Sequence, residues 1–160
     1  MTDPSDALPL FQKALVLGQI PMQRGTLDKS LYLATDEING HHRLSYMKLR
    51  DKTILVLVQF VDAGRLEGIP CFQAGYAVPE AFRGQGLANA TFKAALTEMV
   101  RGFGGFGDFF VETVVGLDNL ASQKISEAVL GGVPQQIADS PSGKPALRYL
   151  RRCSAGQGPF

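Results

Sequence analysis

The segment at residues 53–61, TILVLVQFV, constrains the fold more than any other part of the chain. Only Thr53 and Gln59 are polar, so the segment lacks the alternation of a strand that is exposed on one face. A strand this apolar suits the centre of a sheet that is covered on both faces. The sequence therefore predicts a layered fold built around a buried sheet.

Further strands are predicted on both sides of this segment. Residues 30–38 and 41–49 flank Asn39 and Gly40, a dipeptide preferred in two-residue hairpin turns, which predicts an antiparallel pair. Residues 71–78, CFQAGYAV, follow as another strand after a predicted loop at residues 62–70. The apolar segment at residues 8–20 shows neither the helical nor the strand period clearly, so its type stays open.

In the second half of the chain, helices alternate with strands. A helix is predicted over residues 86–101, a buried strand over 109–115, and a second helix from a cap at Asp118 or Asn119 to Gly131. Residues 134–139 and 146–152 predict a C-terminal hairpin. The predicted fold class is α/β, with a mixed, largely antiparallel central sheet, a β-α-β-α back half and a C-terminal β-hairpin.

Length and charge limit the function classes. The 160 residues suit one domain, predicted over residues 1–152, with a flexible tail at 153–160. A net charge of +1 from 16 basic and 15 acidic side chains argues against nucleic acid as a partner. No apolar run approaches the ~18 residues of a membrane span, and the first residues lack the pattern of a signal peptide, so a cytoplasmic protein without membrane attachment is expected.

Metal ligands are not expected either. Cys71 and Cys153 are far apart in the sequence and form no CxxC pair. His41 and His42 lie beside a predicted turn with no third ligand at a suitable spacing.

The most informative motif is AVPEAFRGQGLANATFKAAL, where a strand ends and a helix begins around Gly84 and Gly86. Glycine lets the backbone approach an anion closely, and the first turn of a helix supplies free N–H groups and a positive dipole end. Arg83 can add a charge-assisted hydrogen bond, and Ala88 keeps the helix start small. These residues predict a loop that binds phosphate through its main chain.

Other interpretations of the glycines are less consistent with the sequence. No Lys-Ser or Lys-Thr follows them, as a Walker loop requires, and the third glycine of the dinucleotide fingerprint is missing. Gly102, Gly104 and Gly107 spell GxGxxG, but they follow a predicted helix and precede a strand, which is the wrong order. A glycine-rich turn without a ligand stays open as an alternative.

The segment VPEAFRGQGLA resembles the acyl-CoA signature of the GNAT superfamily, an Arg or Gln, two residues, Gly, one residue, then Gly or Ala, at Arg83, Gly86 and Ala88. The later segment VVGLDNLASQKISEAVLGG is similar to a second conserved block of that superfamily, through Asn119, Ala121 and Ser122. The resemblance covers roughly residues 53–151. It implies an N-acyltransferase that uses acetyl-CoA and acts on an amine of a small molecule or protein; a homodimer stays open.

The resemblance also implies where the cofactor lies. The pantetheine arm is expected between two diverging strands at residues 71–78 and 109–115, with the acetyl carbonyl near the N–H of Val78 or a neighbour. The remaining phosphate is expected near Lys124 or Lys93. The implied cofactor-binding residues are Ala77, Val78, Arg83, Gly84, Gln85, Gly86, Leu87, Ala88, Asn119, Ser122 and Lys124.

For catalysis, an amine must lose its proton, and Glu112 on a wall of the expected cleft is the candidate base. A Glu112 side chain that faces solvent is an equally open alternative. Many members of the superfamily carry a Tyr in the second helix that protonates the leaving thiolate, but this chain has Ser126 there. Ser126 is expected to orient a water molecule, which leaves Tyr76, Tyr46 or solvent as the proton source.

Two other functions stay open at this stage. The missing Tyr and the short region before residue 31 are compatible with a non-catalytic CoA-binding sensor or interaction module. A toxin-like acetylation of aminoacyl-tRNA is disfavoured by the near-zero net charge.

Overall fold

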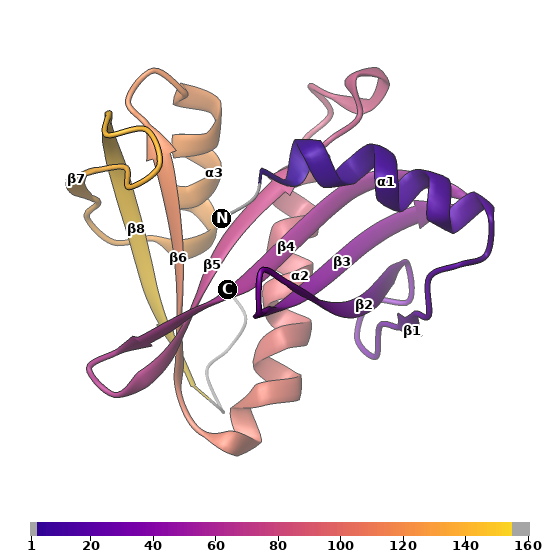
Figure 1. Ribbon diagram of the computed structural model, residues 1–160, viewed down its shortest axis with the longest axis horizontal. Coiled ribbons are helices and arrows are strands. Elements are labelled where there is room, and N and C mark those ends of the chain that lie inside the picture. The colour runs from indigo at the N-terminus through magenta and orange to yellow at the C-terminus, as the bar shows by residue number, and fades with distance from the viewer. Residues whose placement is uncertain (1–2, 155–160) are drawn as a thin grey trace.

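The structure, a computed structural model, describes residues 3–154. Within these residues, eight strands form one sheet in the order β1-β2-β3-β4-β5-β6-β8-β7 (Figure 1). All neighbouring strands pair antiparallel except β5 and β6, which pair parallel. The predicted fold class, with its mixed and largely antiparallel sheet, is confirmed.

The strands are β1 (Gln23–Arg24), β2 (Leu31–Ile38), β3 (His41–Arg50), β4 (Thr53–Leu66), β5 (Ile69–Ala77), β6 (Phe109–Gly116), β7 (Gln135–Ala138) and β8 (Pro145–Cys153). The helices are α1 (Pro4–Val16), α2 (Leu87–Phe103) and α3 (Leu120–Leu130), with short 3-10 turns η1 (Glu80–Phe82) and η2 (Gly104–Phe106). None of the helices between residues 3 and 154 combines the length and hydropathy that crossing a bilayer requires.

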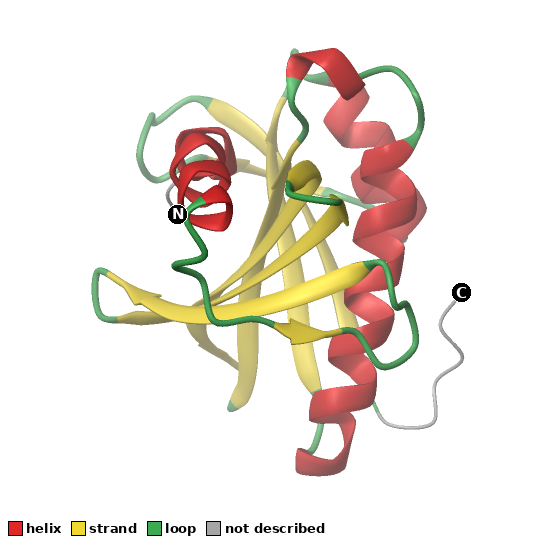
Figure 2. Cartoon of the chain, turned by 90° about the vertical axis from the view of Figure 1, so that its right-hand side faces the viewer, coloured by secondary structure: helices red, strands yellow, loops and turns green. Residues whose placement is uncertain are grey.

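Strand β4 lies at the centre of the core, as its apolar sequence predicts. Val56, Leu57, Val58 and Phe60 are fully buried. One hydrophobic cluster packs α2 and α3 against one face of the sheet, and a second packs α1 against the other. Figure 2 shows α1 and the long helix α2 on opposite sides of the sheet. Burying each large apolar side chain in these layers, compared with leaving it in water, stabilises the folded state by about 1.5–3 kcal/mol.

The turns explain one confirmed prediction and one error. Asn39 and Gly40 both have positive φ, 51° and 79°, as the predicted tight turn between β2 and β3 requires. The loop predicted at residues 62–70 is wrong, because β4 continues to Leu66 and a second tight turn at Glu67 and Gly68 leads directly into β5. The last residues of β4, up to Leu66, are largely exposed. They therefore lack the run of apolar residues by which a buried strand is recognised in a sequence.

Helix α1 resolves the segment whose type the sequence left open. Asp3 caps it by accepting a hydrogen bond from the N–H of Ser5 at 2.9 Å, and Pro4 occupies its first turn. Ala7 and Leu15 pack against Met47 and the β4 side chains on that face of the sheet. Asp3, Pro4 and Ser5, at the N-terminal end of α1, line a cleft of the molecule.

The C-terminal hairpin is confirmed as β7 and β8, and β8 runs one residue past the predicted strand, to Cys153. Cys153 pairs with Phe109 as part of β8 and is 1% exposed, so it packs with the sheet. Residues 155–160 of the predicted tail lie outside the described residues.

Candidate functional site

Strands β5 and β6 separate after a short parallel contact. They pair only at Cys71 with Phe110, Phe72 with Val111 and Gln73 with Glu112. Beyond this contact β5 stays paired with β4, and β6 stays paired with β8. Each strand therefore leaves one edge of main-chain N–H and C=O groups without a sheet partner, and unpaired strand edges can bind an extended ligand.

The gap opens into a cleft of about 1400 Å³. Both strands line it, together with the first residues of α1, α2 and α3 and the loop between β7 and β8. Pockets for one small ligand usually measure about 300–1,000 Å³, so this cleft has room for two reactants side by side.

The start of α2 presents free amide groups to this cleft. Gly84 and Gly86 have φ of 77° and 73°, and no heavy atom outside their neighbours lies within 4 Å of a Cβ built on either. The backbone N–H groups of residues 84–89 donate to no acceptor between residues 3 and 154; the first amide of this region to bond is that of Ala90, to the carbonyl of Gly86. Helix α2 has 17 residues, so its positive dipole end adds to these donors. The junction fits an anion such as a diphosphate.

Two side chains complete this junction. Arg83 donates from Nε to the Val78 carbonyl at 2.9 Å, which ties the loop to the end of β5. No described residue bonds to its two terminal nitrogens, which therefore remain for a ligand. Asn89 lines the cleft, and its Oδ1 is buried without a hydrogen-bond partner in the described part of the chain. Such an unpaired acceptor points to a donor on a bound molecule.

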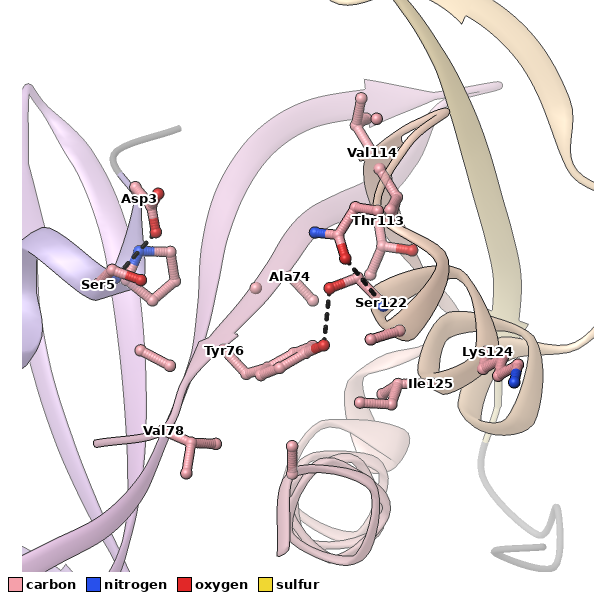
Figure 3. A pocket seen from close by; sticks show the side chains of 18 of the residues that line it. Asp3, Ser5, Ala74, Tyr76, Val78, Thr113, Val114, Ser122, Lys124 and Ile125 are labelled. Carbon is pink, nitrogen blue, oxygen red and sulfur yellow. Dashed lines mark hydrogen bonds between the residues drawn. The ribbon is translucent and has the colours of Figure 1, made fainter. Parts of the chain in front are cut away.

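The start of α3 meets β5 across the cleft. Asn119 caps α3, since its Oδ1 accepts a hydrogen bond from the N–H of Ser122 at 3.2 Å. The Ser122 hydroxyl lies 2.7 Å from the Tyr76 hydroxyl, and Figure 3 shows this contact with Asp3 and Ser5 on the far side of the cleft. The predicted N-cap at Asn119 is thereby confirmed.

Glu112 lies in the cleft, and of the two alternatives the structure supports the cleft-facing one. Its Oε2 accepts a hydrogen bond from Arg148 Nε at 2.6 Å, and the two side chains are only 15% and 23% exposed. The sequence did not predict this pair, because Glu112 and Arg148 meet only through the register of β6 against β8.

The expectation for Ser126 is corrected. Ser126 is 1% exposed, does not line the cleft, and accepts a hydrogen bond from Thr113 Oγ1 at 2.9 Å. It lies on the buried face of α3, so it cannot orient a water molecule beside a ligand in the cleft. Tyr46 is also excluded as a proton source in the cleft, because it is 4% exposed among core residues and burial raises its pKa.

Most of the other predicted site residues come together. The cleft is lined by Tyr76, Ala77, Val78, Arg83, Gly84, Gly86, Leu87, Ala88, Asn119, Ser122 and Lys124. Gln85 lies between the two glycines but is not among the lining residues. Sequence reasoning missed Asp3, Ser5 and the loop at 139–141, which also line the cleft and belong to no recognisable motif. It also missed Asn89, although this residue lies within the glycine-containing motif.

Comparisons with known proteins identify the fold. Neither the protein-family models nor the curated proteins include a match to this sequence. Among solved structures, RimJ from Mycobacterium smegmatis, in complex with CoA-disulfide, is 12% identical with a TM-score of 0.53, covering 92% of this chain and 78% of that one. AAC(6')-Ib, in complex with paromomycin and acetyl-CoA, is 13% identical with a TM-score of 0.54, covering 68% of this chain and 64% of that one.

A third structure, from Bordetella pertussis and assigned to the GNAT family of acetyltransferases, is 21% identical with a TM-score of 0.51. The alignment covers 71% of this chain and 66% of that one. The protein thus spans less than two thirds of two of these three relatives. Identities of 12–21% establish similarity of fold, and the chain has the fold of the GNAT acetyltransferases.

Proposed function

We propose that the protein is an N-acetyltransferase that moves the acetyl group of acetyl-CoA to a primary amine by direct attack within a ternary complex. The observation that carries this proposal is the set of free amides at residues 84–89, which open into a cleft between two diverging strands. The CoA and acetyl-CoA complexes among the structures of the same fold support the choice of cofactor.

The residues of the cleft fit CoA by their chemistry. The amides from Gly84 to Ala88 and the terminal nitrogens of Arg83 would hold the diphosphate, and Lys124, which also lines the cleft, would meet a further phosphate. The unpaired edge of β5 near Ala77 would pair with the amides of the pantetheine arm. Bound there, acetyl-CoA supplies an activated acyl group.

The chain's own groups would then assist the transfer. The N–H of Val78 donates to no described residue, so it is free to stabilise negative charge on the acyl oxygen. Pro79 has no N–H and cannot replace it. An ordinary Lys amine has a pKa of ~10.4, so an acceptor amine needs a base near neutral pH. Glu112 is proposed for this role, and Arg148 would fix the position of its carboxylate.

The proposal is tested by mixing the protein with acetyl-CoA and a broad panel of primary amines, and by following free thiol. Acetylated product that appears in step with thiol is expected for at least one amine. CoA binding is measured in parallel by calorimetry. A protein that binds no CoA would refute the proposal.

A second candidate is a CoA-binding module without catalysis. The observation that favours it is Ser126, which stands where the resemblance implies a Tyr and is buried away from the cleft. Tight CoA binding together with no thiol release from acetyl-CoA across the amine panel would support this candidate and exclude the enzyme.

A further inference from the structure

We propose that Tyr76 is the group that protonates the departing CoA sulfur and that Ser122 is the positioning residue that aligns its hydroxyl. This inference rests on the proposed acetyl transfer and deepens it. It assigns the proton-donor role to a strand residue on the opposite wall of the cleft from α3.

Tyr76 is the tyrosine that the structure brings to the cleft. Its ring packs on Phe92 with the ring centroids 6.5 Å apart, and its hydroxyl lies at the start of α3. Tyr46 and Tyr149 are each 4% exposed and do not line the cleft, and neither does Tyr32. Of the tyrosines, all within the described residues, Tyr76 is therefore the one phenol that can meet a ligand there.

The contact with Ser122 determines where the phenol proton can point. Tyr76 and Ser122 are 2.7 Å apart, and either hydroxyl can donate. Neither hydroxyl has another hydrogen-bond partner between residues 3 and 154. If Ser122 donates, its hydrogen is satisfied and the Tyr76 hydrogen remains free for an acceptor in the cleft. If Tyr76 donates, the Ser122 hydrogen is the free one instead. Because a phenol is a much stronger acid than an alcohol, proton transfer to a bound sulfur favours the first arrangement, in which Tyr76 holds the free hydrogen.

The backbone holds Ser122 in position. Its N–H donates to the Asn119 cap, so the hydroxyl stands in the first turn of α3. This end of the 11-residue helix carries partial positive charge. The Ser122 hydroxyl and the helix end would both stabilise negative charge that develops on the phenol oxygen as its proton leaves.

The transfer conserves atoms, electrons and protons. The neutral amine forms a bond from nitrogen to the acyl carbon, the carbon–sulfur bond breaks, and its electron pair goes to sulfur. The Tyr76 proton moves to that sulfur and gives the thiol, while the excess proton on nitrogen leaves to water. Glu112 acts before the attack, when it takes the proton of the ammonium form of the amine. Tyr76 regains a proton from water when the products leave. A phenol with an ordinary pKa of about 10 and a thiol with one of about 8.5 are close enough for this transfer.

A binding measurement tests the assignment without turnover. Calorimetry gives the Kd of CoA and of desulfo-CoA, which lacks the sulfur, at pH 9, where much of an ordinary thiol is ionised. In the unsubstituted protein CoA should bind more tightly than desulfo-CoA. Tyr76→Phe keeps the ring on Phe92 but should reduce that preference about three- to tenfold, the usual effect of one hydrogen bond. Tyr32→Phe, outside the cleft, should leave it unchanged.

Variants of Ser122 test the positioning role. Ser122→Ala should lose part of the sulfur preference, and Ser122→Thr, which keeps a hydroxyl, should restore it. With any amine that is acetylated, kcat should fall in Tyr76→Phe and fall no further in the double variant with Ser122→Ala. Thermal unfolding confirms that each variant is folded.

The outcomes separate this inference from the proposed function. A preference for CoA over desulfo-CoA that is the same in the unsubstituted protein and in Tyr76→Phe would overturn the role of Tyr76 and leave acetyl transfer standing. Additive losses of kcat in the double variant would overturn the positioning role of Ser122. Failure of the unsubstituted protein to bind CoA would overturn the proposed function itself.

Discussion

At the scale of single residues, Gly86 and Gly84 are required by conformation and by access. Both have positive φ, a region that side chains rarely occupy, and both leave open space where a ligand can approach the backbone. The open space at these glycines would admit the diphosphate of a ligand. A glutamate side chain introduced at one of them would occupy the same space with its carboxylate. Substitution at this junction therefore tests charge and access together.

Gly86→Glu is expected to weaken CoA binding at least about 100-fold, because a carboxylate would occupy the amides that hold the diphosphate. Gly18→Glu is the matched control, since Gly18 also has positive φ, 68°, and open space around it, but does not line the cleft. Calorimetry with CoA compares the two variants. Equal CoA affinity in both would contradict the proposed site.

Glu112→Gln is expected to lower the rate of acetylation about 10²-fold or more near pH 7, and less at high pH. The loss of rate is smaller at high pH because more of the amine is then already neutral in solution and needs no base. The amide oxygen of the substituted side chain can still accept a hydrogen bond from Arg148, so the wall of the cleft is retained. Equal losses at pH 7 and pH 10 would contradict a role as base.

At the scale of elements, Glu98 on α2 fixes the segment before β2. Its carboxylate accepts hydrogen bonds from the N–H groups of Thr26, at 3.1 Å, and Asp28, at 2.7 Å, and also from that of Leu27. Gly25 is needed beside this contact, because a Cβ there would lie 2.2 Å from the Asp28 carbonyl oxygen. The contact joins the edge of the sheet to the helix whose other end forms the candidate site.

Glu98→Ala is expected to lower the free energy of unfolding by about 1–3 kcal/mol, because three backbone donors lose a charged acceptor. Glu98→Gln keeps an acceptor and should cost less. Chemical denaturation measures both values, and CoA affinity should not change, since Glu98 does not line the cleft. A variant as stable as the unsubstituted protein would show that water replaces the carboxylate at no cost.

Local patterns predicted the elements with strong periodicity. Residues 53–61, the turn at Asn39 and Gly40, and the helix α2 were found because burial and turn geometry act on neighbouring residues. The exposed end of β4, up to Leu66, has no such pattern. The burial of Ser126 and the pairing of Arg148 with Glu112 depend on how elements far apart in the chain meet, and these could not be predicted from the sequence.

At the scale of the whole molecule, one interruption of the sheet organises the site. Seven neighbouring pairs hold the strands together, but the β5 and β6 pair covers only three positions in the described sheet. The helices α2 and α3 begin at this gap from one face, and α1 begins beside it on the other. Two reactants could therefore meet in the gap from different faces of the sheet.

The two cysteines report on the integrity of this sheet. Cys71 and Cys153 are 4% and 1% exposed, and burial raises the pKa of each thiol to about 11. Because the thiolate is the reactive form, almost none is present at pH 8 in the folded protein. Both thiols should react with an aromatic disulfide reagent only in denaturant, along the unfolding curve. Rapid reaction of either thiol in buffer would contradict the packing around β6.

The most direct test of the central claim is an NMR titration of uniformly ¹⁵N-labelled protein with CoA. The free amides of residues 84–89 lie at the candidate diphosphate site, and the amide of Val78 lies at the end of β5. If this account is correct, the largest amide shifts on CoA binding occur at Gly84, Gly86 and Ala88, with further shifts at Ala77 and Val78. Binding that leaves these amides unshifted, or no binding, would contradict it.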